Sequence, residues 1–299
     1  MQIKGHTKAR ILRELIAAPD ILVMPGIFDG FSSRLVQHCG FRAGFISGGG
    51  LSESRLGWAD VGLMGYEENV QACRNIVACC DLPLLADADT GYGNAVNVHF
   101  TVRGFEQAGV AGLMLEDQTW PKRCGHLAGK QVISIDEAVE KIRAAATARS
   151  DPDFVIKART DAFATHGIAE VIERLNRYAQ AGADLLFADA LLSVADIEVV
   201  VRNVDKPVCV NMGFGIRTRS TTPLLSARQL QDMGVAAVIY PRMLTSAALQ
   251  GMQNAIEVLQ DSLSTGTAAN RPDLQFSFEQ INGLMGIDAL QHIESASRA

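Results

Sequence analysis

One short pattern recurs along this chain of 299 residues and constrains its fold more than any other feature. Each copy has an amphipathic helical stretch, a glycine, one or two small residues and a short apolar run. The glycine suits the position after a helix end, where φ is positive. The apolar runs lack the alternation of a half-exposed strand, as is typical of parallel strands covered on both faces. The clearest copies lie at 39–46, 108–115, 181–187 and 233–240.

Further apolar runs of the same character raise the number of expected strands to eight; they lie at 21–24, 82–85, 154–156 and 208–210. Strands that alternate evenly with helix-like stretches are typical of an α/β fold. An open, doubly wound sheet is the alternative, but the chain lacks the glycine-rich phosphate-binding loop found in many such sheets. We therefore predict a (β/α)8 barrel of the TIM type.

The chain is expected to form a single domain over residues 1–299, because no linker, low-complexity stretch or interior charge block divides it. Barrels of this type commonly exceed ~250 residues as one domain. A helix near 5–17 should precede the first strand. A C-terminal helical extension is expected over about 262–299, with helical sequence at 277–297.

Charge and cysteine usage exclude several classes of protein. The formal net charge is −6 and there is no basic block, which argues against binding of nucleic acid. Every apolar run is interrupted well short of the ~18 residues of a membrane span. The basic N-terminus lacks an apolar segment, so we expect no secretory signal, with a mitochondrial presequence as the alternative. Six scattered cysteines without a disulfide framework indicate a reducing compartment, and we expect a cytoplasmic protein.

Polar and mostly acidic residues follow nearly every expected strand. In a barrel these positions meet at one end, where the active site lies. Carboxylates crowded in this way repel each other unless a cation neutralises them. The residues at the strand ends are Asp29, Ser47, Asp87, Asp89, Glu116, Asp117, Arg159, Thr160, Asp161, Asp189 and Asn211.

A divalent metal is the simplest cation for these carboxylates. Asp87 and Asp89 are two positions apart on an expected strand, so both should face the same side at its end. Glu116 follows the next strand. Oxygen ligands without histidine or cysteine favour Mg²⁺, or Mn²⁺ as a second choice, over Zn²⁺. Helix capping or loop hydrogen bonding is the alternative role for the aspartates.

The loop after the fourth strand, 117–130, contains a cysteine with basic neighbours. Cys124 follows Lys122 and Arg123 and lies two positions before His126. Such neighbours favour the thiolate form of a cysteine, so Cys124 is a candidate nucleophile or acid. Gly125 and Gly129, together with Pro121, indicate a loop that can open and close. The alternative is an incidental surface cysteine.

Two further strand ends carry groups that bind anions. Arg159 could hold a substrate carboxylate through two parallel hydrogen bonds. Three glycines after Ser47, among them Gly48 and Gly49, expose backbone N–H groups that can bind a second carboxylate or an oxyanion.

At these residues the chain resembles the isocitrate lyase/phosphoenolpyruvate mutase superfamily. The similarity covers nearly the whole sequence, from 24–29 to 278–280. Its most specific motifs are Asp-Ala-Asp-Thr-Gly-Tyr-Gly at 87–93, Glu-Asp-Gln at 116–118, Lys-Arg-Cys-Gly-His at 122–126 and Ala-Arg-Thr-Asp-Ala at 158–162.

The resemblance implies a Mg²⁺ site with Asp87 and Asp89 as ligands and with Asp60 and Glu116 acting through water. It also implies a mobile loop that closes over the substrate and brings in Cys124. The family typically exchanges its last barrel helix between subunits, so we expect a homotetramer. The expected lining of the substrate pocket is Ser47, Gly48, Gly49, Gly125, Arg159, Asp189 and Asn211.

Within this family the motif at 122–126 marks cleavage of carbon–carbon bonds. We therefore predict a Mg²⁺-dependent lyase that cleaves a 2-hydroxy- or 2-oxo-dicarboxylate, through an enolate, to a 2-oxo acid and a carboxylate. Its expected catalytic residues are Lys122, Cys124, His126 and Arg159. The alternatives are a 2-methylisocitrate lyase that acts on a tricarboxylate, a phosphonate mutase or oxaloacetate decarboxylase, and a non-catalytic ligand-binding barrel.

The sequence departs from the family pattern in four places, which favours the dicarboxylate. Phe45 replaces a tyrosine, Asp189 replaces a glutamate and Ser246 replaces an arginine that would bind a tricarboxylate. A longer segment, 212–220, precedes the expected Thr-Pro pair. The third charge of a tricarboxylate must be paired, because an unpaired buried charge is costly. Arg217 or Arg219 could compensate for Ser246, whereas Arg242 lies nearby but in a different register.

Overall fold

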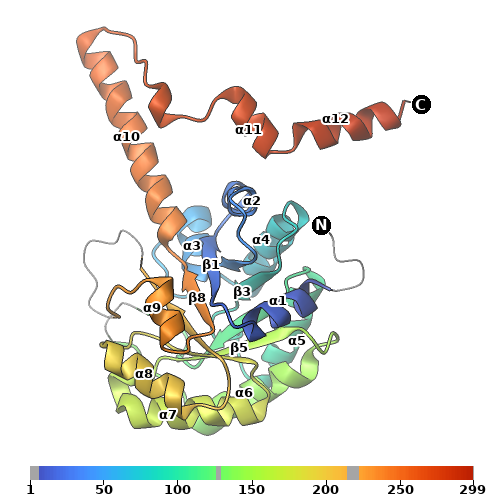
Figure 1. Cartoon of the computed structure of the whole chain (residues 1–299), viewed down its shortest axis with the longest axis vertical. Coiled ribbons are helices and arrows are strands. Elements are labelled where there is room, and N and C mark those ends of the chain that lie inside the picture. Colours follow the sequence, from blue (N-terminus) through green and yellow to red (C-terminus); the bar gives the residue numbers. More distant parts are fainter. Residues whose placement is uncertain (1–6, 126–128, 214–221, 299) are drawn as a thin grey trace.

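A computed structural model describes residues 7–125, 129–213 and 222–298. Eight parallel strands form a closed barrel in sequence order, and the last strand pairs back on the first (Figure 1). This order confirms the predicted barrel over the open sheet. The strands are β1 (Leu22–Ile27), β2 (Gly44–Ile46), β3 (Leu84–Asp87), β4 (Gly112–Glu116), β5 (Val155–Thr160), β6 (Leu185–Ala188), β7 (Val208–Asn211) and β8 (Ala237–Tyr240).

Helices accompany the strands, and most of them surround the barrel. They are α1 (Lys8–Ala17), α2 (Gly30–His38), α3 (Gly48–Leu51), α4 (Tyr66–Ala78), α5 (Ala95–Gln107), α6 (Ile135–Ala148), α7 (Phe163–Ala181), α8 (Val194–Asn203), α9 (Ala227–Asp232) and α10 (Met243–Thr265), with a π-helical turn at Ser52–Leu56. The glycines of the recurring pattern have positive φ as expected, because each follows a helix end; they are Gly40, Gly109, Gly182 and Gly234.

The apolar side chains pack in two shells, one inside the barrel and one between the strands and the helices. Met24, Phe45 and Phe187 belong to the inner shell, together with Leu12 and Ile16 of α1. The pleat of β5 shows how a strand serves both shells. Ile156 and Ala158 face the outer helices, so the alternate residues, Lys157 and Arg159, face the barrel interior.

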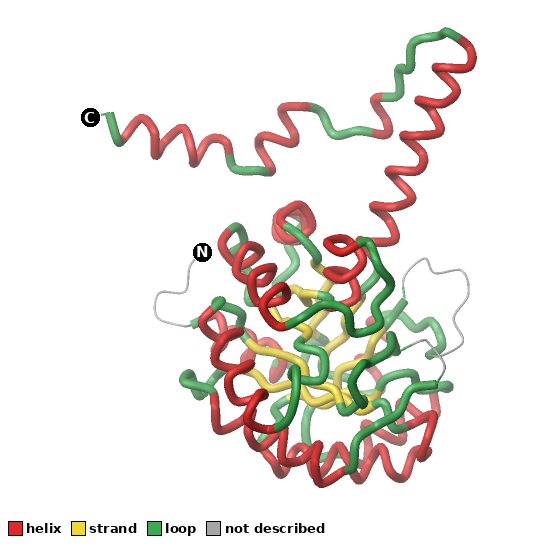
Figure 2. The backbone as a smooth tube through the Cα atoms, turned by 180° about the vertical axis from the view of Figure 1, so that it is seen from behind, coloured by secondary structure: helices red, strands yellow, loops and turns green. Residues whose placement is uncertain are grey.

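The C-terminal part leaves the barrel at α10 (Figures 1 and 2). Of the 23 residues of α10, Thr245 alone is buried. Its exposed apolar residues repeat at helical spacing; they are Leu249, Met252, Ile256, Leu259 and Leu263. The expected start of the extension, near 262, therefore falls inside this helix.

After α10 come a 3-10 turn (Pro272–Leu274), α11 (Phe278–Leu284) and α12 (Ile287–Ala296). The helical segment expected at 277–297 is thus two helices, because Gly286 between them has a left-handed φ of 79°. Within the described ranges, no helix combines the length and apolar character that a membrane span requires.

Candidate active site

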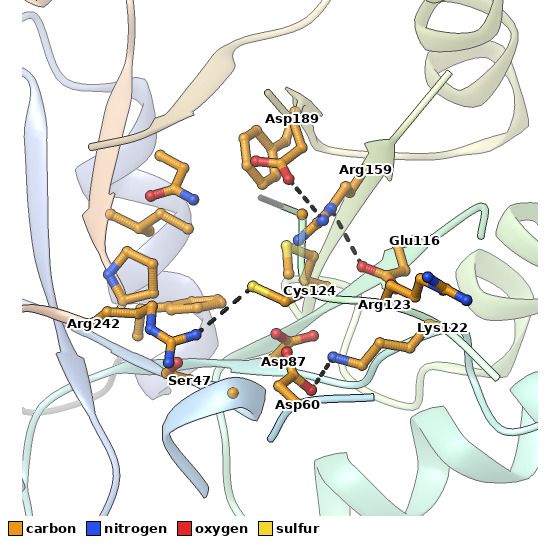
Figure 3. Close-up of a pocket in the computed structure, with 18 residues that line it drawn as sticks. Ser47, Asp60, Asp87, Glu116, Lys122, Arg123, Cys124, Arg159, Asp189 and Arg242 are labelled. Atoms are coloured by element: carbon orange, nitrogen blue, oxygen red, sulfur yellow. Dashed lines mark hydrogen bonds and ion pairs between the residues drawn. The ribbon is translucent and has the colours of Figure 1, made fainter. Parts of the chain in front are cut away.

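The polar strand ends converge on one pocket at the carboxyl end of the barrel (Figure 3). Most of the residues expected to form the site line this pocket; they are Ser47, Gly49, Asp60, Asp87, Glu116, Lys122, Cys124, Gly125, Arg159, Asp189 and Asn211. Gly48 lies behind Asp87, whose Oδ2 would be 2.9 Å from a Cβ added to this glycine. His126 lies outside the described residues. Asp29 caps α2 instead, by accepting a hydrogen bond from the Ser32 backbone.

Asp89 does not line the pocket with Asp87 as the strand periodicity predicted. β3 ends at Asp87, and Asp89 has a left-handed φ of 48°. The backbone N–H of Asp89 donates to Oδ1 of Asp87 at 3.1 Å. Its carboxylate forms an ion pair with Nζ of Lys122 at 2.9 Å. The alternation of side chains between the two faces of a strand does not extend into this turn. Asp89 is therefore connected to the pocket by its ion pair with Lys122.

Lys122 joins the acidic residues of the pocket. Its buried ammonium group pairs with Asp60 as well as Asp89. Burial alone would lower the pKa of Lys122, but the surrounding carboxylates raise it well above its usual value. Burial raises the pKa of Asp89 to about 6 and raises the pKa of Glu116 well above its usual range. The carboxylate cluster therefore carries more negative charge than Lys122 alone can neutralise.

The residues present fit a Mg²⁺ ion. The donors around Asp87 are all carboxylate oxygens, and Oε1 of Glu116 is buried without a hydrogen-bond partner in the part of the chain that the structure describes. In that same part, no three His, Cys, Asp or Glu side chains are arranged to hold a metal ion directly. Mg²⁺ usually keeps several waters and takes few direct protein ligands, so this donor set is consistent with it.

Arg159 occupies the opposite side of the pocket among three carboxylates. Its guanidinium group lies 2.7 Å from Asp161, 2.8 Å from Asp189 and 3.3 Å from Glu116. Burial alone would lower the pKa of Arg159, but these carboxylates raise it well above its usual value. Lys130 supports the cluster from behind, with its Nζ 2.7 Å from Asp161. Arg159 is thus a permanent, pre-oriented cation that lines the pocket.

Asp117 holds the end of β5 in place from the outer side of the barrel. Its carboxylate accepts hydrogen bonds from Thr160 Oγ1 at 2.6 Å and from the Asp161 backbone at 2.9 Å. Arg174 and Tyr178 of α7 donate to the same carboxylate at 3.1 and 2.8 Å. Asp117 therefore serves to position the Arg159 segment and does not contact the pocket itself.

Cys124 enters the pocket beside a residue that sequence reasoning did not assign to it. Nη1 of Arg242 lies 3.7 Å from Sγ of Cys124, and Arg242 also pairs with Glu53 (Figure 3). The backbone N–H of Cys124 donates to the Asp60 carbonyl at 3.1 Å. Lys122, which the sequence suggested as the cationic neighbour, is turned towards the acidic residues instead. The partner is 118 positions away in the chain, so no local pattern could reveal it.

The floor of the pocket is apolar. Phe45, Met114, Phe187 and Ile239 line it, so the hydroxyl of the family tyrosine is absent at position 45. Ser246 is exposed on α10 and does not line the pocket. Arg217 and Arg219 lie outside the described residues, whereas Arg242 lines the wall.

Comparison with known proteins places these residues in a family. A family model described as phosphoenolpyruvate phosphomutase matches residues 12–260. The 2,3-dimethylmalate lyase of Eubacterium barkeri is 38% identical over 95% of this chain and 96% of its own. The probable 2-methylisocitrate lyase 2 of Corynebacterium glutamicum is 44% identical over 87% of this chain and 82% of its own.

Solved structures show the same architecture over almost the full length. Oxaloacetate acetylhydrolase in complex with the inhibitor 3,3-difluorooxalacetate has a TM-score of 0.90 and 30% identity, and the match covers 98% of both chains. Phosphonopyruvate hydrolase in complex with oxalate and Mg²⁺ has a TM-score of 0.84 and 27% identity, covering 97% of this chain and 99% of that chain. The similarity therefore includes the barrel and the C-terminal helices.

Proposed function

This chain belongs to the phosphoenolpyruvate mutase/isocitrate lyase superfamily, and we propose that it is a Mg²⁺-dependent lyase that cleaves a carbon–carbon bond of a small 2-hydroxydicarboxylate. The observation that carries this proposal is the meeting of Cys124 and Arg159 in one pocket with a carboxylate cluster on its wall. A thiol, an anion-binding cation and a metal-binding donor set are the three groups that such a cleavage needs. The relatives named as lyases support the reaction class.

In the bound state, Arg159 holds one substrate carboxylate and the backbone N–H groups of Gly48 and Gly49 hold the other. Asp87 would hold a Mg²⁺ ion, with Asp60, Asp89 and Glu116 acting through water, and the bound ion would supply Lewis-acid polarisation of the substrate's 2-oxygen. A relative of known structure binds oxalate and Mg²⁺ together, which supports this choice of ion and ligand.

Cys124 is the group that we assign to the carbon released by cleavage. A carboxylate of the acidic cluster takes the proton of the C2 hydroxyl, so that C2 becomes the carbonyl of a 2-oxo acid as the bond between C2 and C3 breaks, and the electron pair of that bond passes to C3 as the enolate of a carboxylate. The thiol of Cys124 then gives its proton to C3 as a general acid. Lys122 keeps Asp60 and Asp89 in place during this step. Closure of the 122–125 segment excludes water from the enolate.

The charges around the pocket favour a dicarboxylate over a tricarboxylate. Arg159 already faces three carboxylates of the protein, and Arg242 is paired with Glu53. Ser246, at the position of the expected third cation, is exposed outside the pocket. A third substrate carboxylate would therefore lack the cation that the family provides at position 246, and an unpaired buried charge is costly.

We also propose that the protein works in the cytoplasm as a homotetramer in which α10 packs on a neighbouring subunit. The five exposed apolar residues of α10 form one stripe along the helix. Such a stripe on a helix that leaves its own barrel is typical of an interface.

Release of 2-oxo acid in the presence of Mg²⁺ tests the reaction and the substrate class together. The panel is 2,3-dimethylmalate, citramalate, malate, oxaloacetate, 2-methylisocitrate and isocitrate. We expect turnover of a dicarboxylate and no measurable turnover of either tricarboxylate. Turnover of 2-methylisocitrate would retain the lyase but refute the charge argument, and the 44% identity to a probable 2-methylisocitrate lyase makes this the first competing outcome. Inactivity on the whole panel would refute the proposed function.

A further inference from the structure

Lys157 is a buried lysine directly beneath the proposed active site. Its side chain is fully buried inside the barrel, and Nζ has no nitrogen or oxygen hydrogen-bond partner among the residues that the structure describes; the thiol of Cys209 is its polar neighbour. An unpartnered polar group in the interior destabilises a fold, and charged groups do so most. Lys157 pairs with Met114 of β4 on one side and with Leu185 of β6 on the other. An apolar residue would fit this position in the inner shell. Its presence therefore needs a functional explanation.

Two aromatic rings separate this amine from the ligand. Nζ lies 4.4 Å from the ring centroid of Phe187 and 5.1 Å from that of Phe45. Both rings line the floor of the pocket. The faces of aromatic rings attract cations, and a floor of hydrocarbon screens charge weakly compared with water. A positive charge at Nζ is therefore felt by a ligand on the other side of these rings.

Three other cations of the pocket differ from Lys157 because carboxylates already neutralise them. Lys122 pairs with Asp60, Arg159 with Asp189, and Arg242 with Glu53. Burial lowers the pKa of Lys157, and Cys209 and Asp87 oppose this shift. An anion above the floor opposes it further, because it stabilises the charged form of the amine.

We propose that Lys157 is a specificity-determining residue, whose charge beneath the aromatic floor increases the affinity of the pocket for ligands with two negative charges over ligands with one. Lys157 does not touch the ligand, and its effect depends on the ligand's charge and not on its shape. The inference rests on the proposed function, because it takes a Mg²⁺-bound carboxylate ligand as the occupant. The inference also predicts that the buried amine of Lys157 lowers the stability of the fold while it increases the affinity for the ligand.

The test compares oxalate with oxamate, which has nearly the same shape but one negative charge fewer. Calorimetric titration of both ligands, at saturating Mg²⁺, is carried out on the wild-type protein and on Lys157→Met. Because Coulomb energy is proportional to ligand charge, the variant should lose about tenfold in affinity for oxalate and only about threefold for oxamate. Its thermal unfolding midpoint should equal or exceed that of the wild type.

Two further variants separate charge from packing. Leu185→Met changes a neighbouring core residue without removing a charge, and both affinities should stay within about twofold of the wild type, as volume-conserving core changes are usually tolerated. Lys157→Gln removes the charge but keeps a polar group, and it serves if Lys157→Met does not fold.

Equal losses for the two ligands, or an unchanged affinity for oxalate in Lys157→Met, would overturn the inference and leave the proposed function intact. A lower unfolding midpoint with parallel loss of both ligands would assign Lys157 a structural role and overturn it as well. Failure of the wild-type protein to bind oxalate with Mg²⁺ would overturn the proposed function, and the inference with it.

Discussion

Gly125 lies directly against Asp189, so that a Cβ added to the glycine would overlap Oδ2 of this carboxylate. The same Cβ would lie 2.8 Å from Nη2 of Arg159. The segment that carries Cys124 can therefore approach the strand ends only because position 125 has no side chain. The position of Cys124 relative to Arg159 therefore depends on the contact between Gly125 and Asp189.

Gly125→Ala should reduce kcat/KM about 100-fold, because misplacement of a catalytic group by ~1 Å has effects of that size. The thermal unfolding midpoint should change less than catalysis does, since residues 122–125 belong to no helix or strand of the barrel. Gly251→Ala is the matched control, because nothing lies within 4 Å of its added Cβ on α10. Steady-state kinetics on both variants make the comparison. Wild-type activity in Gly125→Ala would mean that catalysis does not require the approach seen here.

Cys124→Ser should lose turnover while it keeps its affinity for oxalate and Mg²⁺ within about twofold, since a general acid acts after binding. Thermal unfolding provides the readout: oxalate with Mg²⁺ should raise the unfolding midpoint of this variant as much as that of the wild type, and EDTA should remove the effect. A smaller rise in the variant would indicate that Cys124 supports the structure of the site and not the proton transfer.

Lowering the pH should reduce the free energy of unfolding, in part because Asp161 becomes protonated. Burial alone would raise the pKa of Asp161, but Arg159 and Lys130 hold it below its usual range. A carboxyl group whose folded-state pKa is depressed stabilises the fold fully above its unfolded pKa of about 3.9, and this stabilisation is lost as the pH falls towards the folded value. Urea unfolding of the wild type and Asp161→Asn between pH 6 and 3 measures this. The free energy of unfolding should fall less steeply with acid in the variant; parallel curves would refute the assignment.

The apolar stripe of α10 should hold the subunits together. Leu259→Glu places a charge in the stripe, whereas Gln250→Glu adds the same charge on another face of the helix. Analytical ultracentrifugation should show a tetramer for the wild type and for Gln250→Glu, and smaller species for Leu259→Glu, because a charge is costly in an apolar interface. Equal masses for the two variants would show that this stripe is not the interface.

Patterns local in sequence predicted the barrel and most of its pocket. The apolar runs marked all eight strands, and the polar residues that follow them, such as Asp87 and Arg159, meet because parallel strands end on one side. The pattern failed where the backbone leaves strand geometry, as at Asp89, whose φ is 48°. It also could not reveal contacts between distant segments, such as Cys124 with Arg242.

Lys157 illustrates a different limit. A lysine in the middle of a strand is compatible with the sequence pattern of a barrel, but its burial without a partner depends on the pleat of β5 and on the rings of two other strands. The site around it is therefore a property of the closed barrel and not of any one segment.

The most direct test of the central claim is the identity of the products formed in D₂O with Mg²⁺. NMR and mass spectrometry of the reaction with 2,3-dimethylmalate should show a 2-oxo acid together with a carboxylate that has gained one deuterium at the carbon released by cleavage. This outcome would establish carbon–carbon cleavage and protonation of the enolate carbon in one experiment. Intact substrate, or carbon dioxide as the released fragment, would contradict the account.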